Sequence, residues 1–562
     1  MNTSINKHLG TSLTFLLVTL SAVPALAAPS APVVRTPGKH SVVVVSSQPT
    51  IAKPAVREAI PTSAPKQEPK TQTSSPASAP KQNTIPAVSN NPAPVADKTA
   101  PAPKEAKPAA AKEKPSAEQK KARQQAADAV VPGHPFRIQN KEENYKSQLS
   151  KAATKKLDAT LANMIGGAED KVPGLAVIVF KDGKEVYRNM MGNRFLSPRN
   201  PNWNLPLTAD SRFRVASISK IFTAAGYLKL VEEGKIKLDE DVSRYLGFTL
   251  RNPRFPNKVI TSRMLLSHTS SIRDYPTAYV PFKSSLKSFF TGNNCWSSET
   301  QPPGVYFCYS NLNYILLGTI IEKVTGQRFD RYMSKTVLGP LDIKGSFNLR
   351  DLSSAELQKM GTLYRKTKGA GQPYQAQIDD RPIELPDASR LAGYRPGTNA
   401  GIFSPQGGLR VSPNELTHML QMLMKKGKYQ GRQILSPATY KLMTDQIWQY
   451  DPLTHNGDIE YSAIESYGMP IQLFKGNGET RPVPSRPGFH LYGHLGEAYG
   501  FIGGLMWQPE TQNGFIFLQN GCASSEKYNP GNYSLNNRWE ENFMKAIIDT
   551  VFPYDNTEFK SF

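Results

Sequence analysis

A long stretch without aromatic residues constrains the fold of this chain more than any other feature. Residues 28–135 contain no Phe, Tyr or Trp and hold 19 of the 46 prolines in the 562-residue sequence. Pro, Ala, Ser, Lys and Gln dominate there, so the stretch has too little apolar surface to offset the entropy of ordering it. We therefore predict a disordered, Pro/Ala/Lys-rich linker over residues 28–135 and a folded domain over residues 136–562.

The first 27 residues have the pattern of a secretory signal peptide. Lys7 supplies the positive start, residues 13–23 form an apolar core, and Ala25-Leu26-Ala27 is a small-residue cleavage site. The apolar run is shorter than the roughly 18 residues that a membrane span needs, and no later segment is apolar enough to cross. The pattern predicts cleavage after Ala27 and a periplasmic or secreted protein without a transmembrane helix.

The positive charge of the chain is concentrated partly in the linker. The net charge is +22, and residues 28–135 carry 15 Lys and Arg against 7 Asp and Glu, which gives +8. A basic tail suits contact with an anionic cell envelope, and a solvated spacer is the competing interpretation. The export signal and the absence of a basic-aromatic motif argue against nucleic acid as a partner.

Strand-like segments lie at both ends of the predicted domain, with helical segments between them. Strands are predicted over residues 173–180, 185–191, 500–507 and 514–519, and helices over residues 218–233, 311–324, 414–426 and 537–551. Lys181-Asp182-Gly183 joins the first two strands as a hairpin turn. This order predicts an α/β domain whose antiparallel sheet is built from both ends, with a helical region inserted and packed on it.

A serine and a lysine three residues apart begin the first helical segment. Ser217 and Lys220 lie on one face of a helix, so the amine can remove the proton of the hydroxyl. That makes Ser217 a candidate nucleophile that needs no histidine base. The spacing also occurs elsewhere, including in the linker, so alone it is a weak signal. Tyr309-Ser310-Asn311 and His494-Leu495-Gly496 follow in order and select Ser217.

Five motifs in a fixed order carry a family resemblance. They are Phe-Arg-Val-Ala-Ser-Ile-Ser-Lys at 213–220, Leu-Leu-Ser-His-Thr-Ser at 265–270, Pro-Gly-Val-Tyr-Phe-Cys-Tyr-Ser-Asn at 303–311, Gly-Gly-Leu at 407–409 and Gly-His-Leu-Gly at 493–496. From about Val172 to about Phe552 the chain resembles the penicillin-recognising serine hydrolases of the class C β-lactamase type. That group includes DD-peptidases, D-aminopeptidases and β-lactamase-like esterases. The resemblance implies the serine β-lactamase/DD-peptidase fold, with a cleft between sheet and helices.

The resemblance also implies roles for four residues of the first and third motifs. Ser217 would attack a carbonyl and form an acyl-enzyme. Lys220 would be its base once burial and a nearby positive group have lowered the pKa of the amine. Tyr309 would be a second base or a proton carrier, with Lys220 as the cation that could stabilise its phenolate. Asn311 would hydrogen-bond Lys220 and the substrate amide.

The last motif would line the substrate. His494 stands where many relatives have the lysine of Lys-Thr-Gly, which weakens the case for a β-lactamase because a fixed cation is missing. Gly496 would let its strand approach the substrate closely. By resemblance, the backbone N–H groups of Ser217 and Glu497 would form the oxyanion hole.

Ser267 and His268 suggest a serine–histidine pair, but adjacent residues on a helix point apart. We therefore interpret them as structural. Ser271 follows them where the family usually has glycine, which puts the shape of this loop in question.

The cysteines are three in number, Cys295, Cys308 and Cys522. In an exported protein, Cys295 and Cys308 are close enough in sequence for us to predict a disulfide between them. Cys522 is then expected to be a buried small residue.

The function that these patterns predict is an exported serine hydrolase working through a covalent acyl-enzyme on D-Ala-containing peptidoglycan peptides. The alternatives are an esterase for small acyl esters or acylated glycans, a class C-like β-lactamase, and a non-catalytic peptidoglycan-binding module. The eight histidines show no metal-ligand spacing and there is no phosphate loop, so neither a metal nor a cofactor is expected.

Overall fold

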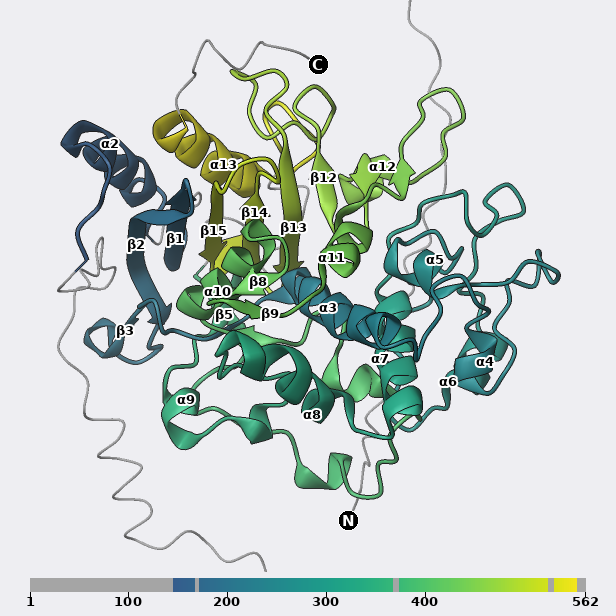
Figure 1. The fold of residues 1–562 in the computed structure, drawn as a ribbon. Coiled ribbons are helices and arrows are strands. Elements are labelled where there is room, and N and C mark those ends of the chain that lie inside the picture. The colour runs from purple at the N-terminus through teal and green to yellow at the C-terminus, as the bar shows by residue number, and fades with distance from the viewer. Residues whose placement is uncertain (1–144, 167–170, 367–372, 524–529, 553–562) are drawn as a thin grey trace, which may run out of the picture. The chain divides into compact units, whose positions relative to one another are not determined.

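The computed structural model describes residues 145–166, 171–366, 373–523 and 530–552 (Figure 1). The predicted signal peptide (1–27) and linker (28–135) lie outside the described residues, as does the predicted start of the domain at residue 136. Those three boundaries remain predictions.

A nine-stranded antiparallel sheet joins the two ends of the described chain (Figure 1). In spatial order its strands are β10 (Trp448–Gln449), β11 (Ser466–Tyr467), β12 (Gln472–Phe474), β13 (Leu491–Ala498), β14 (Phe501–Trp507), β15 (Gly514–Gln519), β1 (Gly174–Lys181), β2 (Lys184–Phe195) and β3 (Leu205–Pro206). β1 pairs with β15 from Leu175↔Gln519 to Phe180↔Gly514 and with β2 along its other edge. The prediction that both ends of the domain build one antiparallel sheet is confirmed.

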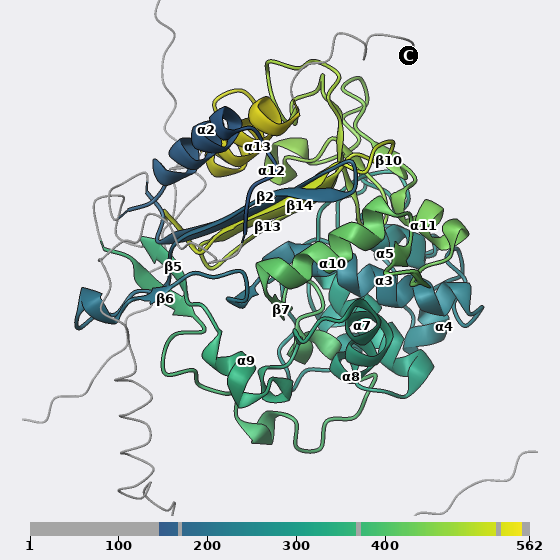
Figure 2. The ribbon, with the colours of Figure 1, turned by 60° about the vertical axis from the view of Figure 1, so that its left-hand side comes forward.

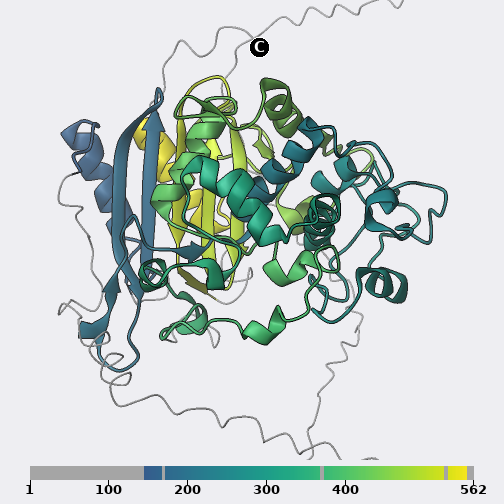
Figure 3. The ribbon, with the colours of Figure 1, turned by 60° about the horizontal axis from the view of Figure 1, so that its bottom comes forward.

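Helices cover both faces of this sheet, as Figures 2 and 3 show. α2 (Lys151–Ala162) and α13 (Arg538–Val551) pack on one face, and α3 (Ser219–Glu232), α7 (Asn311–Thr325) and α10 (Pro413–Met424) lie on the other. Successive side chains of a strand point to opposite faces. Ala176 and Ile178 of β1 therefore enter the core on the side of α10, whereas Val177 and Val179 enter the core on the side of α2 and α13. Because both faces are covered, β1 is apolar at consecutive positions.

Shorter elements complete the inserted helical region and its margins. The remaining helices are α4 (Ser243–Leu246), α5 (Ser262–Leu266), α6 (Leu286–Gly292), α8 (Phe329–Met333), α9 (Ser354–Gln358), α11 (Pro437–Thr444) and α12 (Ile459–Ser462). Three small sheets contain β16 (Gly521–Ala523), β5 (Leu363–Lys366) and β6 (Gln375–Ile378), then β4 (Phe213–Arg214) and β7 (Arg410–Val411), then β8 (Lys428–Tyr429) and β9 (Arg432–Gln433). In the part of the chain that the structure describes, no helix has both the length and the apolar character to cross a membrane.

The central helix α3 is buried on almost every side. Ile221, Phe222, Ala225 and Leu228 form an apolar stripe, and Lys220 is fully buried as well. α3 packs against α7 and α8 and lies beneath the sheet, so neighbours surround it. This burial places an amine in a setting of low polarity, which matters for its chemistry.

Candidate active site

The turn before α3 exposes Ser217 and buries the residues around it. Residues 216–218 form a single 3-10 turn, and Ala216 adopts a left-handed φ of 46°. A residue with a Cβ rarely adopts that conformation, so surrounding contacts must hold it. The N–H of Val215 donates to the carbonyl of Leu409 at 3.0 Å on one side of the turn. Ser217 is half-buried, while Ala216 and Ile218 are buried. The turn therefore presents one hydroxyl.

Hydrogen bonds hold the Lys220 amine so that one side of it faces the Ser217 hydroxyl. Its Nζ lies 3.0 Å from Ser217 Oγ. The same amine donates to Asn311 Oδ1 at 2.8 Å and to the backbone oxygen of Gln406 at 2.9 Å. Both oxygens can only accept, so they engage two N–H bonds. In the neutral amine the lone pair is left facing Ser217, which is the orientation for removing its proton.

Burial also moves the titration of Lys220 toward neutral pH. Desolvation lowers the pKa of Lys220 from its ordinary value of 10.5 to about 7, and the nearby carboxylate of Asp274 opposes the decrease. A low pKa was expected from burial together with a positive neighbour, but the charged neighbour is negative. Near neutral pH the amine is therefore unprotonated in a substantial fraction of molecules.

Tyr309 reaches the same hydroxyl from α7's side of the site. Its OH donates to Ser217 Oγ at 2.9 Å. Lys220 Nζ lies over the face of the Tyr309 ring, 4.9 Å from its centre, and contacts the π-system rather than the phenol oxygen. Burial raises the pKa of Tyr309 above its usual range. The phenol therefore stays neutral, and this geometry favours a proton carrier over a phenolate base.

β13 passes so close to the Ser217 turn that only glycine fits at residue 496. A Cβ on Gly496 would lie 2.9 Å from the oxygen of Val215 and 3.3 Å from the nitrogen of Ile218. Antiparallel pairing with β14 fixes the position of this strand. The two backbone N–H groups expected to bind an oxyanion, those of Ser217 and Glu497, belong to these two adjoining segments.

His494 of β13 is buried and uncharged. Its Nε2 lies 3.0 Å from the hydroxyl of Tyr467, and its Nδ1 lies 2.5 Å from the carbonyl of Leu495. The carbonyl can only accept, so Nδ1 carries the proton and Nε2 accepts from the phenol. Burial lowers the pKa of His494 to about 3. No cation therefore stands at the position that is lysine in many relatives.

Ser267 and His268 form no hydrogen bond with each other. Ser267 Oγ donates to the carbonyl of Arg263 at 2.8 Å, whereas His268 Nδ1 accepts from the N–H of Ser310 at 3.0 Å. The His268 ring packs against Tyr309 with 4.3 Å between ring centres and the two rings tilted by 31°. His268 thus contacts a site residue as a packed, neutral ring, and burial lowers its pKa well below its usual value.

Ser271 adopts the backbone shape that a glycine would allow. Its φ is 64°, in the left-handed region. Asn252 Nδ2 donates to Ser271 Oγ at 3.3 Å, and the N–H of Ser297 donates to the Ser271 carbonyl at 2.9 Å. These bonds hold the loop in place although serine replaces the family's glycine.

Two groups at the site were not among the predicted residues. The Gln406 carbonyl binds Lys220, and the Asp274 carboxylate accepts the side chain and the N–H of Asn311. A backbone carbonyl leaves no signal in residue type. Asp274 could have been found in the sequence only by its position, six residues after His268 and just beyond the Leu-Leu-Ser-His-Thr-Ser motif.

The cysteines do not form the predicted disulfide. Cys295, Cys308 and Cys522 are free, buried thiols, so the predicted bridge between Cys295 and Cys308 is wrong. Backbone hydrogen bonds join Cys308 and Cys295 to the two ends of the segment 268–273. Cys308 N donates to the His268 carbonyl at 2.9 Å, and Arg273 N donates to the Cys295 carbonyl at 2.9 Å. Main-chain pairing thus closes the loop that a disulfide was expected to hold.

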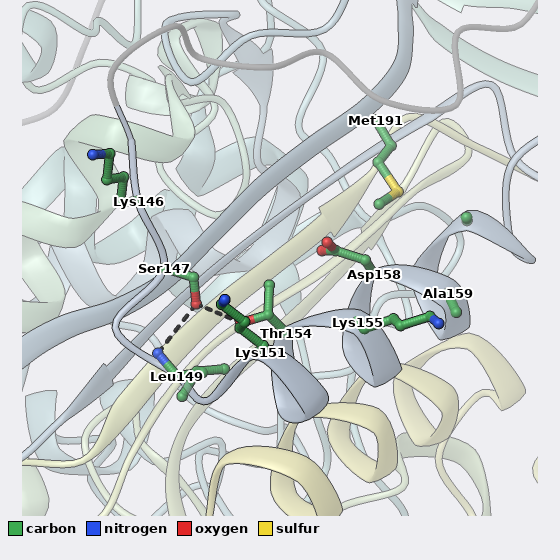
Figure 4. A pocket seen from close by; sticks show the side chains of 10 residues that line it. Lys146, Ser147, Leu149, Lys151, Thr154, Lys155, Asp158, Ala159 and Met191 are labelled. Atoms are coloured by element: carbon green, nitrogen blue, oxygen red, sulfur yellow. Dashed lines mark hydrogen bonds between the residues drawn. The ribbon is translucent and has the colours of Figure 1, made fainter.

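A separate hollow of about 640 Å³ lies between α2, the segment before it and β2 (Figure 4). Its lining includes Asp158 but no residue of the Ser217 site. Asp158 Oδ1 already accepts from Tyr187 OH at 2.6 Å and from Asn189 Nδ2 at 2.7 Å. The hollow is therefore separate from the Ser217 site, and its carboxylate already accepts two hydrogen bonds within the fold. Across the described ranges, no three His, Cys, Asp or Glu side chains gather in a way that could hold a metal ion.

Comparison with known proteins agrees with this geometry. A match to the Beta-lactamase family spans residues 153–535, well over half of the chain. The chain belongs to the beta-lactamase family. The resemblance predicted from the five motifs is therefore confirmed.

Individual relatives of this beta-lactamase family protein are more distant. Protein flp of Staphylococcus aureus (strain N315) is 31% identical over 172 residues, which cover 30% of this chain and 34% of the relative. Penicillin-binding protein 4 of Amycolatopsis lactamdurans is 26% identical over 287 residues, 50% of this chain and 67% of the relative. The chain thus matches about a third of the length of the first relative and about two thirds of the second.

A solved structure supports the fold. The octameric penicillin-binding protein homologue from Pyrococcus abyssi superimposes with a TM-score of 0.51 at 24% identity, covering 70% of this chain and 76% of that one. At this identity the likeness concerns the fold of the beta-lactamase family protein and not its substrate.

Proposed function

We propose that the protein hydrolyses acyl bonds through a covalent acyl-enzyme on Ser217. One observation carries the proposal. The buried amine of Lys220 donates to two oxygens that can only accept, and its remaining side lies 3.0 Å from Ser217 Oγ. That arrangement places a nucleophile next to its base, and a merely structural lysine would not need it.

In the proposed acylation step, the Ser217 proton moves to the Lys220 lone pair while Oγ bonds to the substrate carbonyl carbon. The carbonyl oxygen becomes an oxyanion beside the N–H groups of Ser217 and Glu497. Tyr309, whose OH lies 2.9 Å from Ser217 Oγ, passes a proton to the leaving amine or alcohol as its bond to carbon breaks. The proton that Lys220 took from Ser217 then returns to the phenolate oxygen of Tyr309, which restores both groups. Water then hydrolyses the ester by the reverse route.

For the substrate we propose D-Ala-containing peptides of peptidoglycan. A relative named as a penicillin-binding protein, matched over 67% of its length, supports this class. The predicted signal peptide and basic linker support a periplasmic or secreted location with access to the cell envelope, and the linker suits contact with anionic envelope polymers. These two segments lie outside the described residues, so the location and that contact rest on sequence alone.

Small acyl esters are the second candidate, and His494 favours them. A neutral imidazole with both nitrogens engaged offers no fixed charge to a substrate carboxylate. A peptide ending in free D-Ala or a penicillin carries such a carboxylate, whereas a simple ester does not. The same observation places the β-lactamase alternative third.

The proposal predicts a specific outcome for three substrates offered to the full chain. We expect release of D-Ala from a peptide ending in D-Ala-D-Ala, and an intact-mass increase of one adduct with fluorescent penicillin, located on the Ser217 peptide. Turnover of p-nitrophenyl acetate without adduct or D-Ala release would favour the esterase. No reaction with any of the three would leave a binding module as the better description and contradict the proposal.

The rate should also depend on pH in one direction through the physiological range. Lys220 must be unprotonated to act, and its pKa is about 7, so kcat/KM should rise with pH through about pH 7. Burial raises the pKa of Tyr309, so no loss is expected up to about pH 9, since an unperturbed tyrosine titrates near 10. Initial rates on one ester from pH 5 to 9, corrected for spontaneous hydrolysis, measure this. A rate that is flat from pH 5 to 8 would contradict Lys220 as the base.

A further inference from the structure

Asp274 gathers hydrogen-bond donors from three consecutive residues at the start of α7. Its Oδ1 accepts from Ser310 Oγ at 2.8 Å and from the N–H of Leu312 at 3.1 Å. Its Oδ2 accepts from the N–H of Asn311 at 2.9 Å and from Asn311 Nδ2 at 2.8 Å. A carboxylate can accept all four bonds, and its charge is favourable at a helix N-terminus.

These bonds decide which end of the Asn311 amide faces the lysine. The Nδ2 group is a donor and is committed to Asp274. The other end, Oδ1, is then turned toward Lys220, whose Nζ donates to it at 2.8 Å. The reversed amide would place a carbonyl oxygen against the carboxylate and an NH2 group against the amine, two unfavourable contacts. Asp274 therefore disfavours that orientation.

We infer that Asp274 is a positioning residue: by fixing the Asn311 amide and the start of α7, it aims the lone pair of Lys220 at Ser217. The inference rests on the proposed function, because it concerns the same nucleophile and base. The hydrogen bonds of Asp274 go to Ser310, Asn311 and Leu312 and not to Ser217 or Lys220, so it acts through Asn311. It lies in the loop after α5, 36 residues before Ser310 and far from α3 in sequence.

Because Asp274 is charged, it affects the pKa of Lys220, which a residue that only packs in the fold would not do. The groups facing Lys220 from other elements are His268, His494, Tyr309 and Tyr314. Burial lowers the pKa of both histidines and raises the pKa of both tyrosines, so all four are neutral near pH 7. Among these described neighbours, Asp274 is the charged one, and it raises the pKa of Lys220.

The test is the pH profile of kcat/KM for Asp274→Asn in the full chain, on whichever substrate the parent turns over. The plateau rate should fall about 10²-fold, because the base loses its alignment. The rising limb should move below the parent's limb near pH 7, because removing the negative charge lowers the pKa of Lys220 further. Asp274→Glu keeps the charge and should keep the limb near the parent's position.

Two further variants separate positioning from stability. Glu322→Gln removes a buried carboxylate at the other end of α7, where it accepts from Phe329 N at 2.9 Å and Gly397 N at 2.7 Å. It should leave the plateau and limb at the parent's values. In an Asn311→Ala background, Asp274→Asn should cause little further loss of plateau rate, because Asp274 acts through Asn311.

Equal effects of Asp274→Asn and Glu322→Gln, or a lower plateau without a displaced limb, would overturn the inference and leave a structural role. If Asp274→Asn does not fold, Asp274→Ser, which is smaller and still accepts hydrogen bonds, is measured in the same way. If Ser217→Ala is inactive but the Asp274 variants behave like the parent, the role of Asp274 is rejected and the proposed function stands. Retained activity in Ser217→Ala would reject the proposed function.

Discussion

Replacement of Ser217 by alanine is expected to reduce turnover of every accepted substrate by on the order of 10⁴-fold or more. The variant lacks the oxygen that lies 3.0 Å from Lys220 Nζ and 2.9 Å from Tyr309 OH, so no acyl-enzyme can form. Steady-state rates and intact-mass detection of the penicilloyl adduct measure the loss. Circular dichroism must show that the variant folds, which we expect because the side chain is small and half-buried.

Ser267→Ala is the matched control for this prediction. Ser267 is also a serine beside a candidate base, but its hydroxyl donates to the Arg263 carbonyl and contacts Thr269 Oγ1 at 3.0 Å. We expect most of the activity to remain, with a loss of stability of about 1 kcal/mol for the buried hydrogen bond. A folded Ser217→Ala protein with near-parent turnover, or an inactive but folded Ser267→Ala protein, would mean that the nucleophile has been assigned wrongly.

Gly496→Ala is expected to lower kcat/KM by about 10²–10³-fold, the cost of losing one oxyanion donor. The added Cβ would lie 2.9 Å from the Val215 oxygen and 3.2 Å from Ile218 Cγ1, so β13 must move away from the Ser217 turn. Such a shift separates the N–H of Glu497 from that of Ser217. Comparison of kcat/KM for parent and variant on one substrate measures the effect.

Gly407→Ala tests whether the expected loss of kcat/KM in Gly496→Ala comes from crowding of the Ser217 turn or from displacement of β13. A Cβ on Gly407 would contact the same turn, but at 3.6 Å from the carbonyl carbon of Ala216, an ordinary van der Waals distance. This variant should therefore keep its rate within a few-fold of the parent. If Gly496→Ala were equally active, the close approach of β13 would have no role in oxyanion binding.

Long strands were predictable because their sequence pattern is local. The run at 514–519 has the same bounds as β15, since five buried apolar or small residues and Gln519 lie between two asparagines. The helix predicted over 414–426 begins at Pro413, one residue earlier, because Ser412 and Glu415 form a capping box ahead of it. Two-residue strands such as β10 and β11 carry no period of their own and depend on neighbours in the sheet.

The residues of the candidate site could be predicted from the sequence, but the hydrogen bonds that join them could not. Spacing along one helix placed Ser217 beside Lys220, because residues three apart share a face. The start of α7 shows where that reasoning ends. Ser310 has the residue type of an N-cap, yet its side chain caps no backbone group of the helix. Asp274, distant in sequence, accepts the N–H groups instead. Only tertiary structure brings such a pair together.

The strand order of the sheet governs when the site can exist during synthesis. Ser217, Lys220 and Tyr309 are translated early, but β1 has no partner on one edge until β15 arrives more than 300 residues later. β13, which carries Gly496 and Glu497, is also made after all three of these residues. A nascent chain therefore holds the nucleophile without the strand that completes its surroundings. Contacts so distant in sequence form slowly. Reactivity at Ser217 should thus appear only after β13 and β15 have joined the sheet.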